Sequence, residues 1–222
     1  MSRSFRAVVW DVDGVLIDSE PLHLSSFTEI CRRHGFAYDA VDNTRWLGKS
    51  FIDMWHGIPE LRGFGLSFEE LRDEIVDLYI SRVHGGMARR PAPELVARLA
   101  RRGVIQGCAS SSPRRIVEAN VAALGVTGHL SAVLGREDVS HGKPAPDLYL
   151  LAAERLGLAP ADCLAIEDTA SGLAAAKAAG FTAIAWPNAM TAAMDFSAAD
   201  YLLDDLAAFD WERVGYTSGH YD

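Results

Sequence analysis

Two hydrophobic periodicities divide the chain into segments. The run Ala7-Val8-Val9-Trp10 ends in Asp11 and is broken by Gly14, which is typical of a buried strand with carboxylates at its carboxyl end. From about residue 87, short apolar runs alternate with segments of helical spacing. The pattern predicts helices over 93–102, 114–124, 147–156 and 171–179, and strands over 104–109, 132–134, 163–166, 182–186 and 201–203. This alternation predicts a Rossmann-like, doubly wound α/β fold with a parallel sheet.

The segment that follows the first strand has a different pattern. Apolar residues recur there at helical spacing, first at Leu22, Phe27 and Ile30 and again over 68–83. No strand is predicted between these two stretches. The pattern therefore predicts an inserted α-helical cap domain in an α/β core, with the core formed by residues 1–16 and 87–222 and the cap by residues 17–86.

Composition and charge restrict the possible functions. Of the 222 residues, 49% are hydrophobic, and the formal net charge is −9. This charge argues against sequence-independent binding of nucleic acid, which needs a basic surface. A phosphate that approaches so acidic a protein needs local positive charge, from a metal ion or a lysine. The three cysteines are far apart, which predicts reduced thiols and neither a disulfide frame nor a zinc site: Cys31, Cys108 and Cys163.

The chain also lacks the patterns of membrane proteins. No apolar run approaches the roughly 18 residues of a membrane span, and the N-terminal segment lacks the long apolar region of a signal peptide. We therefore expect a cytoplasmic protein with no membrane partner. No heptad or apolar stripe demands a partner chain, so a monomer is the expected oligomeric state.

Polar side chains gather where the predicted strands end. In an open parallel sheet, ligands bind beyond the carboxyl ends of the strands. Crowded carboxylates repel one another unless a cation joins them, and oxygen ligands without His or Cys suit Mg²⁺ shared with a substrate phosphate. The candidates at these strand ends are four acids, two hydroxyls and an amine: Asp11, Asp13, Glu167, Asp168, Ser110, Ser111 and Lys143.

These residue types suit phosphoryl transfer. A carboxylate such as Asp11 can attack phosphorus and form an acyl phosphate. Asp13 can protonate the leaving oxygen and later deprotonate water. Ser110 and Ser111, with neighbouring backbone N–H groups, can hold phosphoryl oxygens, and Lys143 can neutralise charge on the nucleophile and the transferring group. The residues therefore predict Mg²⁺-dependent phosphoryl transfer through a phosphoaspartate at Asp11, and they suit transfer to water or to a second hydroxyl equally well.

Four motifs carry a resemblance to a known family. The run Asp11-Val12-Asp13-Gly14-Val15-Leu16-Ile17-Asp18-Ser19 resembles the first signature of the haloacid dehalogenase superfamily. Ser110 resembles the second signature, Lys143 in Gly-Lys-Pro-Ala-Pro-Asp the third, and Glu167-Asp168 the fourth. The resemblance extends from about Ala7 to Leu203. The helical insertion is similar to the cap of the branch that contains β-phosphoglucomutase and many sugar-phosphate phosphatases.

The resemblance implies a role for each matching residue. Asp11 would be the nucleophile and a metal ligand. Asp13 would be the general acid and base and would offer its backbone carbonyl to the metal. Asp168, with Glu167, would complete the metal site.

Two cap residues are further candidates for substrate contact. His23 occupies a position that faces the active site in many members of the resembled branch, and Lys49 lies in a run that resembles a cap loop reaching toward the substrate. A structural histidine and a solvated lysine are equally compatible with the sequence. Trp46 and Trp55 are predicted to pack inside the cap, and two arginine pairs are predicted to be solvated, Arg89-Arg90 and Arg101-Arg102.

The proposed site residues also have structural interpretations. Asp11 and Asp13 could form the turn before Gly14. A residue of Ser110 to Ser112 could cap the helix that begins near residue 113, and Asp168 could cap the helix that follows it. Lys143 could be an ordinary surface lysine. Helix caps and an anion site are compatible, because a helix N-terminus is itself an anion site.

Four functions compete for these residues. A phosphatase acting on a small phosphorylated metabolite, with sugar phosphates as the expected class, is favoured. A β-phosphoglucomutase-like mutase is the alternative, but mutases of that branch usually carry an arginine shortly after the cap-loop Gly-x-Ser, where this chain has Phe51. A metal-independent dehalogenase usually lacks the second aspartate, which is present here as Asp13. A non-catalytic binding module tends to lose the nucleophile or the lysine, and both are present.

Overall fold

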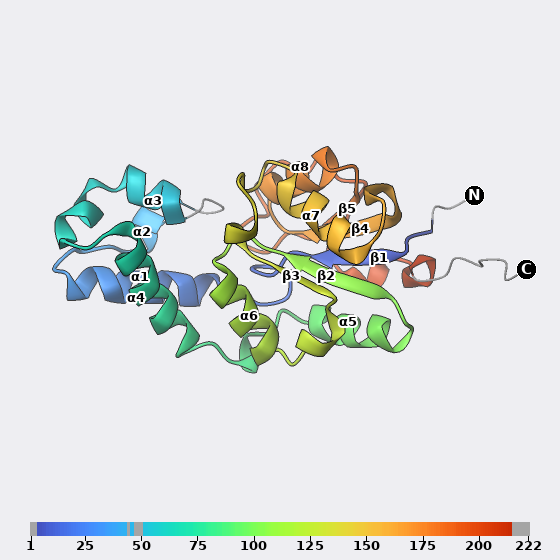
Figure 1. Ribbon diagram of the computed structural model, residues 1–222, viewed down its shortest axis with the longest axis horizontal. Coiled ribbons are helices and arrows are strands. Elements are labelled where there is room, and N and C mark those ends of the chain that lie inside the picture. Colours follow the sequence, from blue (N-terminus) through green and yellow to red (C-terminus); the bar gives the residue numbers. More distant parts are fainter. Residues whose placement is uncertain (1–3, 44, 47–50, 215–222) are drawn as a thin grey trace, which may run out of the picture. The chain divides into compact units, whose positions relative to one another are not determined.

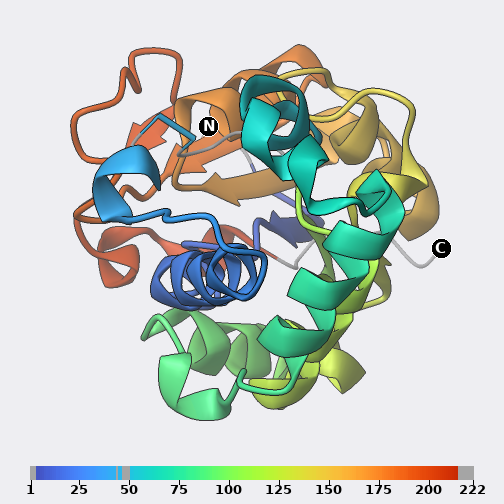
Figure 2. The ribbon, with the colours of Figure 1, turned by 90° about the vertical axis from the view of Figure 1, so that its left-hand side faces the viewer.

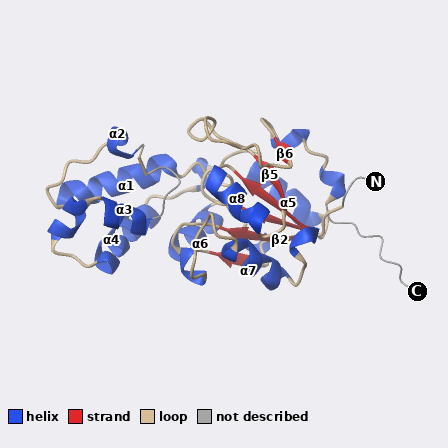
Figure 3. Ribbon diagram, turned by 90° about the horizontal axis from the view of Figure 1, so that it is seen from above, coloured by secondary structure: helices blue, strands red, loops and turns tan. Residues whose placement is uncertain are grey.

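The chain forms two compact units. The computed structural model describes residues 4–43, 45–46 and 51–214. One unit comprises Met1–Asp18 and Gly85–Asp222, and the other comprises Ser19–His84. Every strand of the described residues belongs to the larger unit, whereas the smaller unit consists of helices and loops (Figure 3). The assignment of these units as a catalytic core and a cap stays a prediction.

The larger unit is built on a six-stranded parallel sheet with the order β3-β2-β1-β4-β5-β6. This is the doubly wound order, so the predicted Rossmann-like fold is confirmed. The strand order reverses at β1, which pairs with β2 on one side and with β4 on the other. The strands are β1 (Ala7–Trp10), β2 (Ile105–Ala109), β3 (Ala132–Leu134), β4 (Cys163–Glu167), β5 (Thr182–Ala185) and β6 (Tyr201–Leu202).

Helices cover both faces of this sheet. Two of them, α7 (Asp147–Leu156) and α8 (Ala170–Ala178), lie on one face, and α5 (Ala92–Arg101) and α6 (Arg114–Ala123) lie on the other (Figure 1). The face under α7 and α8 carries small buried residues from four strands, which leaves room for large side chains from the helices and loops: Ala7, Ala109, Ala165 and Ala183. All four helices were predicted from the apolar spacing, with limits within one residue of those observed.

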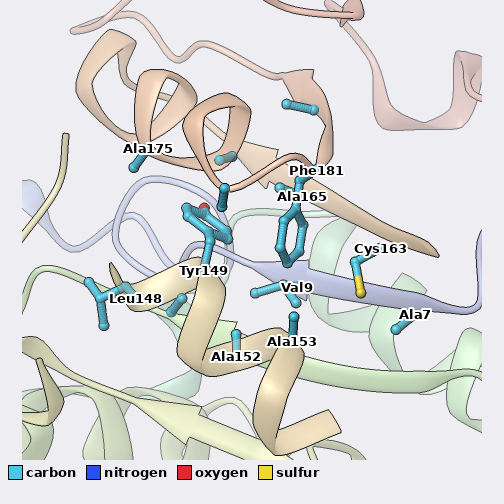
Figure 4. Packing of buried hydrophobic residues seen from close by; sticks show 14 of the residues in the cluster. Ala7, Val9, Leu148, Tyr149, Ala152, Ala153, Cys163, Ala165, Ala175 and Phe181 are labelled. Carbon is cyan, nitrogen blue, oxygen red and sulfur yellow. The ribbon is translucent and has the colours of Figure 1, made fainter. Parts of the chain in front are cut away.

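Two aromatic rings fill the space between α7 and the sheet. The ring centroids of Tyr149 and Phe181 lie 5.2 Å apart with an interplanar angle of 62° (Figure 4). This edge-to-face geometry is favourable for aromatic pairs. Both rings are buried, and the phenol oxygen of Tyr149 points toward the carboxyl end of β4, where it meets Glu167. The apolar core therefore reaches up to the polar edge of the sheet.

The smaller unit is a helical cluster (Figure 2). It contains α1 (Glu20–Arg33), α2 (Ala40–Asn43), α3 (Phe51–Gly57), a 3₁₀ segment (Pro59–Phe64) and α4 (Phe68–Ile80). The predicted apolar residues of α1 are buried. Trp46 and Trp55 pack against the apolar cluster of this unit, as predicted. The sequence pattern indicated α1 and α4 individually, but it did not resolve α2, α3 or the 3₁₀ segment.

A capping box fixes the start of α4. The Ser67 hydroxyl accepts a hydrogen bond from the Glu70 N–H at 3.2 Å, and the Glu70 carboxylate accepts one from the Ser67 N–H at 2.8 Å. This reciprocal pair satisfies two backbone donors that the first helical turn would otherwise leave unpaired. The cap sets the register in which Leu71, Ile75 and Tyr79 face the core of the smaller unit.

Two further expectations concern cysteines and membranes. The thiols of Cys31, Cys108 and Cys163 are free and buried, as predicted. Over the described ranges, no helix combines the length and the apolar character that crossing a bilayer requires.

The arginine pairs correct the sequence analysis. Arg102 donates to the carbonyls of Trp211 at 3.0 Å and Val214 at 3.4 Å. Arg89 donates to the carbonyls of Trp186 at 3.0 Å, Pro187 at 2.7 Å and Gly14. The prediction that both pairs are solvated is therefore wrong for these two members. Each guanidinium satisfies carbonyl groups from segments that are distant in the chain, which local spacing does not reveal.

The packing of α7 leads to a stability prediction. Leu148 is fully buried against the sheet, whereas Leu150, two residues on, is 44% exposed. We expect Leu148→Ala to lower the free energy of unfolding by about 2–5 kcal/mol, because it leaves a cavity in the core. Leu150→Ala should cost about 0.5 kcal/mol or less. Urea denaturation followed by circular dichroism measures both, and equal losses would contradict this orientation of α7.

Candidate active site

Three carboxylates meet at the carboxyl ends of β1 and β4, the neighbouring strands at which the strand order reverses. The Asp11 N–H donates to the Ile166 carbonyl at 2.9 Å, so the ladder between β1 and β4 continues past the end of β1. Glu167 and Asp168 follow Ile166 directly. Since both strands are parallel and in register, one oxygen each of Asp11, Glu167 and Asp168 lies within 4.8 Å of the others. This position, beyond the carboxyl ends of strands at a switch point, is where doubly wound folds bind ligands.

Burial makes the carboxylates of this cluster costly to ionise. Asp11 is 6%, Glu167 1% and Asp168 3% exposed. Burial raises the pKa of Asp11 well above its usual value, an effect that Lys143 opposes and the neighbouring carboxylates reinforce. Burial and then Glu167 raise the pKa of Asp168 to about 8. The protein groups around these carboxylates therefore do not fully compensate their negative charge.

Asp168 has a buried oxygen, Oδ1, without a hydrogen-bond partner among the described residues. A buried carboxylate oxygen left unpaired costs free energy. The second oxygen, Oδ2, accepts a hydrogen bond from Asn188 Nδ2 at 2.7 Å. Asp168 is thus held on one side, with its other oxygen available to a cation.

Lys143 supplies positive charge within this cluster. Its side chain is 3% exposed, and Nζ donates to Asp11 Oδ1 at 2.6 Å, Glu167 Oε1 at 2.5 Å and the Ala109 carbonyl at 2.8 Å. These three acceptors match the three N–H groups of an ammonium. Burial alone would lower the pKa of Lys143, but Asp11 and Glu167 raise it above its usual range. The interpretation of Lys143 as an ordinary surface lysine is wrong.

Glu167 accepts a hydrogen bond from Tyr149, a residue that was not predicted from the sequence. The Tyr149 hydroxyl donates to Glu167 Oε1 at 2.5 Å, so this oxygen accepts from both Tyr149 and Lys143. Burial and then Glu167 raise the pKa of Tyr149 well above its usual value, which keeps the phenol protonated. The only signal for Tyr149 in the sequence is a hydroxyl on the apolar face of a predicted helix.

Two glycines let the backbone approach these carboxylates. Gly14 has a φ of +81°, and a Cβ there would lie 2.1 Å from Asp168 Oδ2. A Cβ on Gly172, in α8, would lie 2.0 Å from Glu167 Oε2. At both positions a side chain would displace a carboxylate, so glycine is required for the observed arrangement.

Asp13 and Ser110 are joined by hydrogen bonds. The Ser110 hydroxyl donates to Asp13 Oδ2 at 3.0 Å and accepts from the Ser112 N–H at 2.9 Å. The amide nitrogen of Asn120 donates to Asp13 Oδ1 at 3.2 Å. Ser110 is buried, and Ser111 beside it is partly exposed. The structure therefore brings Ser110 to Asp13, which the order of the motifs alone did not specify.

The helix-cap interpretations are not supported. The N-cap of α6 is Pro113, without a side-chain hydrogen bond, so Ser110 does not cap this helix. The N-cap of α8 is Thr169, whose hydroxyl accepts from the Gly172 N–H at 3.1 Å. Asp168 is therefore not the cap of α8, and its side chain is directed to the carboxylate cluster.

A family comparison agrees with this arrangement. A family model for hydrolases, described as haloacid dehalogenase-like hydrolase, matches residues 5–180. The chain belongs to the haloacid dehalogenase-like hydrolase family. The matched range contains every residue of the carboxylate cluster together with Lys143 and Ser110, so the resemblance of the four motifs is confirmed at the level of the family.

Curated relatives of this haloacid dehalogenase-like hydrolase include phosphatases. The fructose-1-phosphate phosphatase YqaB of Escherichia coli (strain K12) is 31% identical over 185 residues, covering 83% of this chain and 97% of the relative. Hexitol phosphatase B of the same organism is 31% identical over 194 residues, covering 83% of this chain and 85% of the relative.

A solved structure of a family member has the same fold. A mutant of CbbY from Rhodobacter sphaeroides in complex with xylulose-(1,5)bisphosphate is 25% identical, with a TM-score of 0.82. The match covers 92% of this chain and 96% of the CbbY chain. The likeness therefore extends over both units of the hydrolase.

The predicted substrate contacts of the hydrolase lie in its smaller unit. His23 belongs to α1, and its ring centroid lies 4.5 Å from that of Tyr79 in α4. This contact gives His23 a packing role inside the smaller unit. Lys49 lies outside the described residues. Contact of either side chain with a substrate stays a prediction.

The buried ammonium leads to a second stability prediction. In EDTA at pH 8, we expect Lys143→Met to lower the free energy of unfolding by about 3–5 kcal/mol, because buried carboxylates lose their partner. The matched control is Lys177→Met, which removes a partly exposed pair with Asp200 at 2.6 Å and should cost about 1 kcal/mol or less. Equal losses in urea denaturation would show that Lys143 does not compensate the cluster.

Proposed function

We propose that this hydrolase is a Mg²⁺-dependent phosphatase that acts on a small phosphorylated metabolite through a phosphoaspartate at Asp11. The observation that carries the proposal is the buried Asp11 carboxylate, bonded to Lys143 and adjacent to the unpartnered oxygen of Asp168. Membership of the family supports a hydrolase, and the names of the relatives support phosphate esters of sugars and sugar alcohols as the substrate class.

The donor set suits a magnesium ion. Asp11, Asp168 and Glu167 would hold it, together with the backbone carbonyl of Asp13, and all of these donors are the hard oxygens that Mg²⁺ prefers. The unpartnered Asp168 Oδ1 and the raised pKa values of Asp11 and Asp168 support a cation at this place. When bound, the ion would polarise the phosphoryl group and neutralise its charge.

The protein residues would divide the chemistry between them. Asp11 attacks phosphorus through a carboxylate oxygen, which breaks the bond to the leaving oxygen and forms an acyl phosphate. Asp13 gives its proton to that oxygen and then takes a proton from the water that attacks the acyl phosphate. Lys143 stabilises charge on Asp11 and the transferring group, while Ser110 and Ser111, with nearby backbone N–H groups, hold the phosphoryl oxygens.

The side chain of Phe51 favours water over a sugar hydroxyl as the second acceptor. A mutase of the resembled branch would grip a second phosphate with an arginine near this position. Here the Phe51 ring lies 5.3 Å from Phe68, stacked, and 6.2 Å from Phe27. It packs against the apolar cluster of the smaller unit. An apolar packing residue at this place supports the phosphatase over the mutase.

A substrate panel with the full chain tests the proposal. With Mg²⁺, we expect release of inorganic phosphate from sugar and sugar-alcohol phosphates, and no release in EDTA. Turnover that survives EDTA would favour metal-independent chemistry. Isomerisation of a β-sugar 1-phosphate without phosphate release would favour a mutase, and a folded protein inert toward every ester would favour a binding module.

The nucleophile is tested by a nearly isosteric change. We expect Asp11→Asn to lower phosphate release at least about 10³-fold, because the amide cannot attack phosphorus. Its circular dichroism spectrum should match that of the wild type, since the side-chain volume is kept. Phosphate release near the wild-type rate would show that Asp11 is not the nucleophile.

The raised pKa of Asp168 gives a pH prediction. Its value of about 8 lies far above the ordinary value near 3.8, so between these pH values the folded protein holds a proton that the unfolded chain lacks. This contribution to stability is present at about pH 4 and is lost as the pH rises through 8. We therefore expect urea stability in EDTA to fall over this range, and the stabilisation by Mg²⁺ to grow with pH.

The difference between the Mg²⁺ and EDTA curves isolates the cluster from other titrating groups. Asp168→Asn is the matched control, because it keeps the shape of the side chain but removes the charge, and it should reduce the stabilisation by Mg²⁺ and flatten its pH dependence. A stabilisation by Mg²⁺ that is constant from pH 5 to 9 would contradict the prediction.

A further inference from the structure

Asn120 occupies a position of α6 where the pattern calls for an apolar residue. The buried face of this helix comprises Ile116, Val117, Asn120 and Val121, and Asn120 is 0% exposed. Burying a side-chain amide is unfavourable unless hydrogen bonds compensate for the lost water. Polar residues at core positions that break the local pattern are expected chiefly at functional sites. The buried amide of Asn120 is therefore expected to make a specific polar contact.

The reason lies in the contact with Asp13. Asn120 Nδ2 donates to Asp13 Oδ1 at 3.2 Å, while the Ser110 hydroxyl donates to Asp13 Oδ2 at 3.0 Å. The Ser112 N–H donates to the Ser110 oxygen at 2.9 Å, which orients the hydroxyl proton toward Asp13. Each oxygen of this carboxylate thus accepts from a buried side chain. Donors on different oxygens restrict the orientation of the carboxylate plane.

We propose that Asn120 is a positioning residue for Asp13 in the reaction. The inference rests on the proposed function, in which Asp13 protonates the leaving oxygen and later deprotonates water. Proton transfer of this kind requires the carboxylate to be aligned with the reacting oxygen. The amide of Asn120, fixed on a helix that packs on the sheet, restricts rotation of the Asp13 side chain, which stands on the turn after β1.

A second buried amide provides the comparison for a purely structural role. Gln106, in β2, is also 0% exposed, and its Nε2 donates to the Val96 carbonyl at 3.0 Å. Its Oε1 accepts from Trp10 Nε1 at 3.0 Å. These contacts join a strand to neighbouring elements and involve no carboxylate. Gln106→Leu therefore removes a buried amide from the same unit without touching Asp13.

The dependence on the leaving group distinguishes positioning from stability. A sugar phosphate releases a basic alkoxide and needs the proton of Asp13, whereas p-nitrophenyl phosphate releases a far more acidic phenol and needs it little. In Asn120→Leu we expect kcat/KM for the sugar phosphate to fall about 10- to 100-fold, and kcat/KM for p-nitrophenyl phosphate about 3-fold or less. Gln106→Leu should leave the ratio of the two values unchanged.

A second variant covers the case in which Asn120→Leu does not fold. Asn120→Asp keeps the shape of the side chain but places a carboxylate opposite Asp13, so it should produce the same selective loss. Equal losses for both esters, or no loss, in the folded Asn120 variants would overturn the positioning role alone. A folded wild-type protein that turns over neither ester would overturn the proposed function, and the role of Asn120 with it.

Discussion

The charge balance at the carboxyl ends of β1 and β4 is the constraint on which the site depends. Parallel pairing in register brings Asp11, Glu167 and Asp168 together in a buried place, where carboxylates strongly resist ionisation. Lys143 compensates part of this charge from a separate loop. The remaining demand for positive charge makes this edge of the sheet suited to a cation, because a cation lowers the cost of ionising carboxylates that the protein alone under-compensates.

Close packing and hydrogen bonds fix the positions of these carboxylates. Gly14 and Gly172 allow backbone to lie directly against carboxylates, and Asn188 and Tyr149 each donate to one oxygen of the cluster. The same principle holds for Asp13, which accepts from side chains that lie on two other elements. Glu167, Asp168 and Asp13 are thus each oriented by at least one donor to which no reactive role is assigned, namely Tyr149, Asn188 and Asn120 respectively.

The two units contribute different kinds of information about function. The carboxylate cluster and Lys143 both belong to the larger unit. In the smaller unit, the side chain of Phe51 packs against the apolar cluster. Our preference for a phosphatase over a mutase therefore rests on a side chain outside the carboxylate cluster.

The sequence by itself determined the fold class, the helices and strands of the sheet-containing unit, the helices α1 and α4, and the acids and lysine of the site. Strand and helix periodicities are local, and residues at the ends of parallel strands must meet at one edge, so Asp11, Lys143 and Asp168 could be grouped from their positions in the chain. Only the tertiary structure decided which donors orient them. Tyr149, Asn120, Asn188 and Arg89 lie on helices and loops far away in sequence, and their partners depend on helix rotation and loop course. Hydrophobic spacing predicts that such residues face inward, but it does not predict which polar atom they contact. A hydrogen bond depends on ångström-scale geometry that no local sequence pattern encodes.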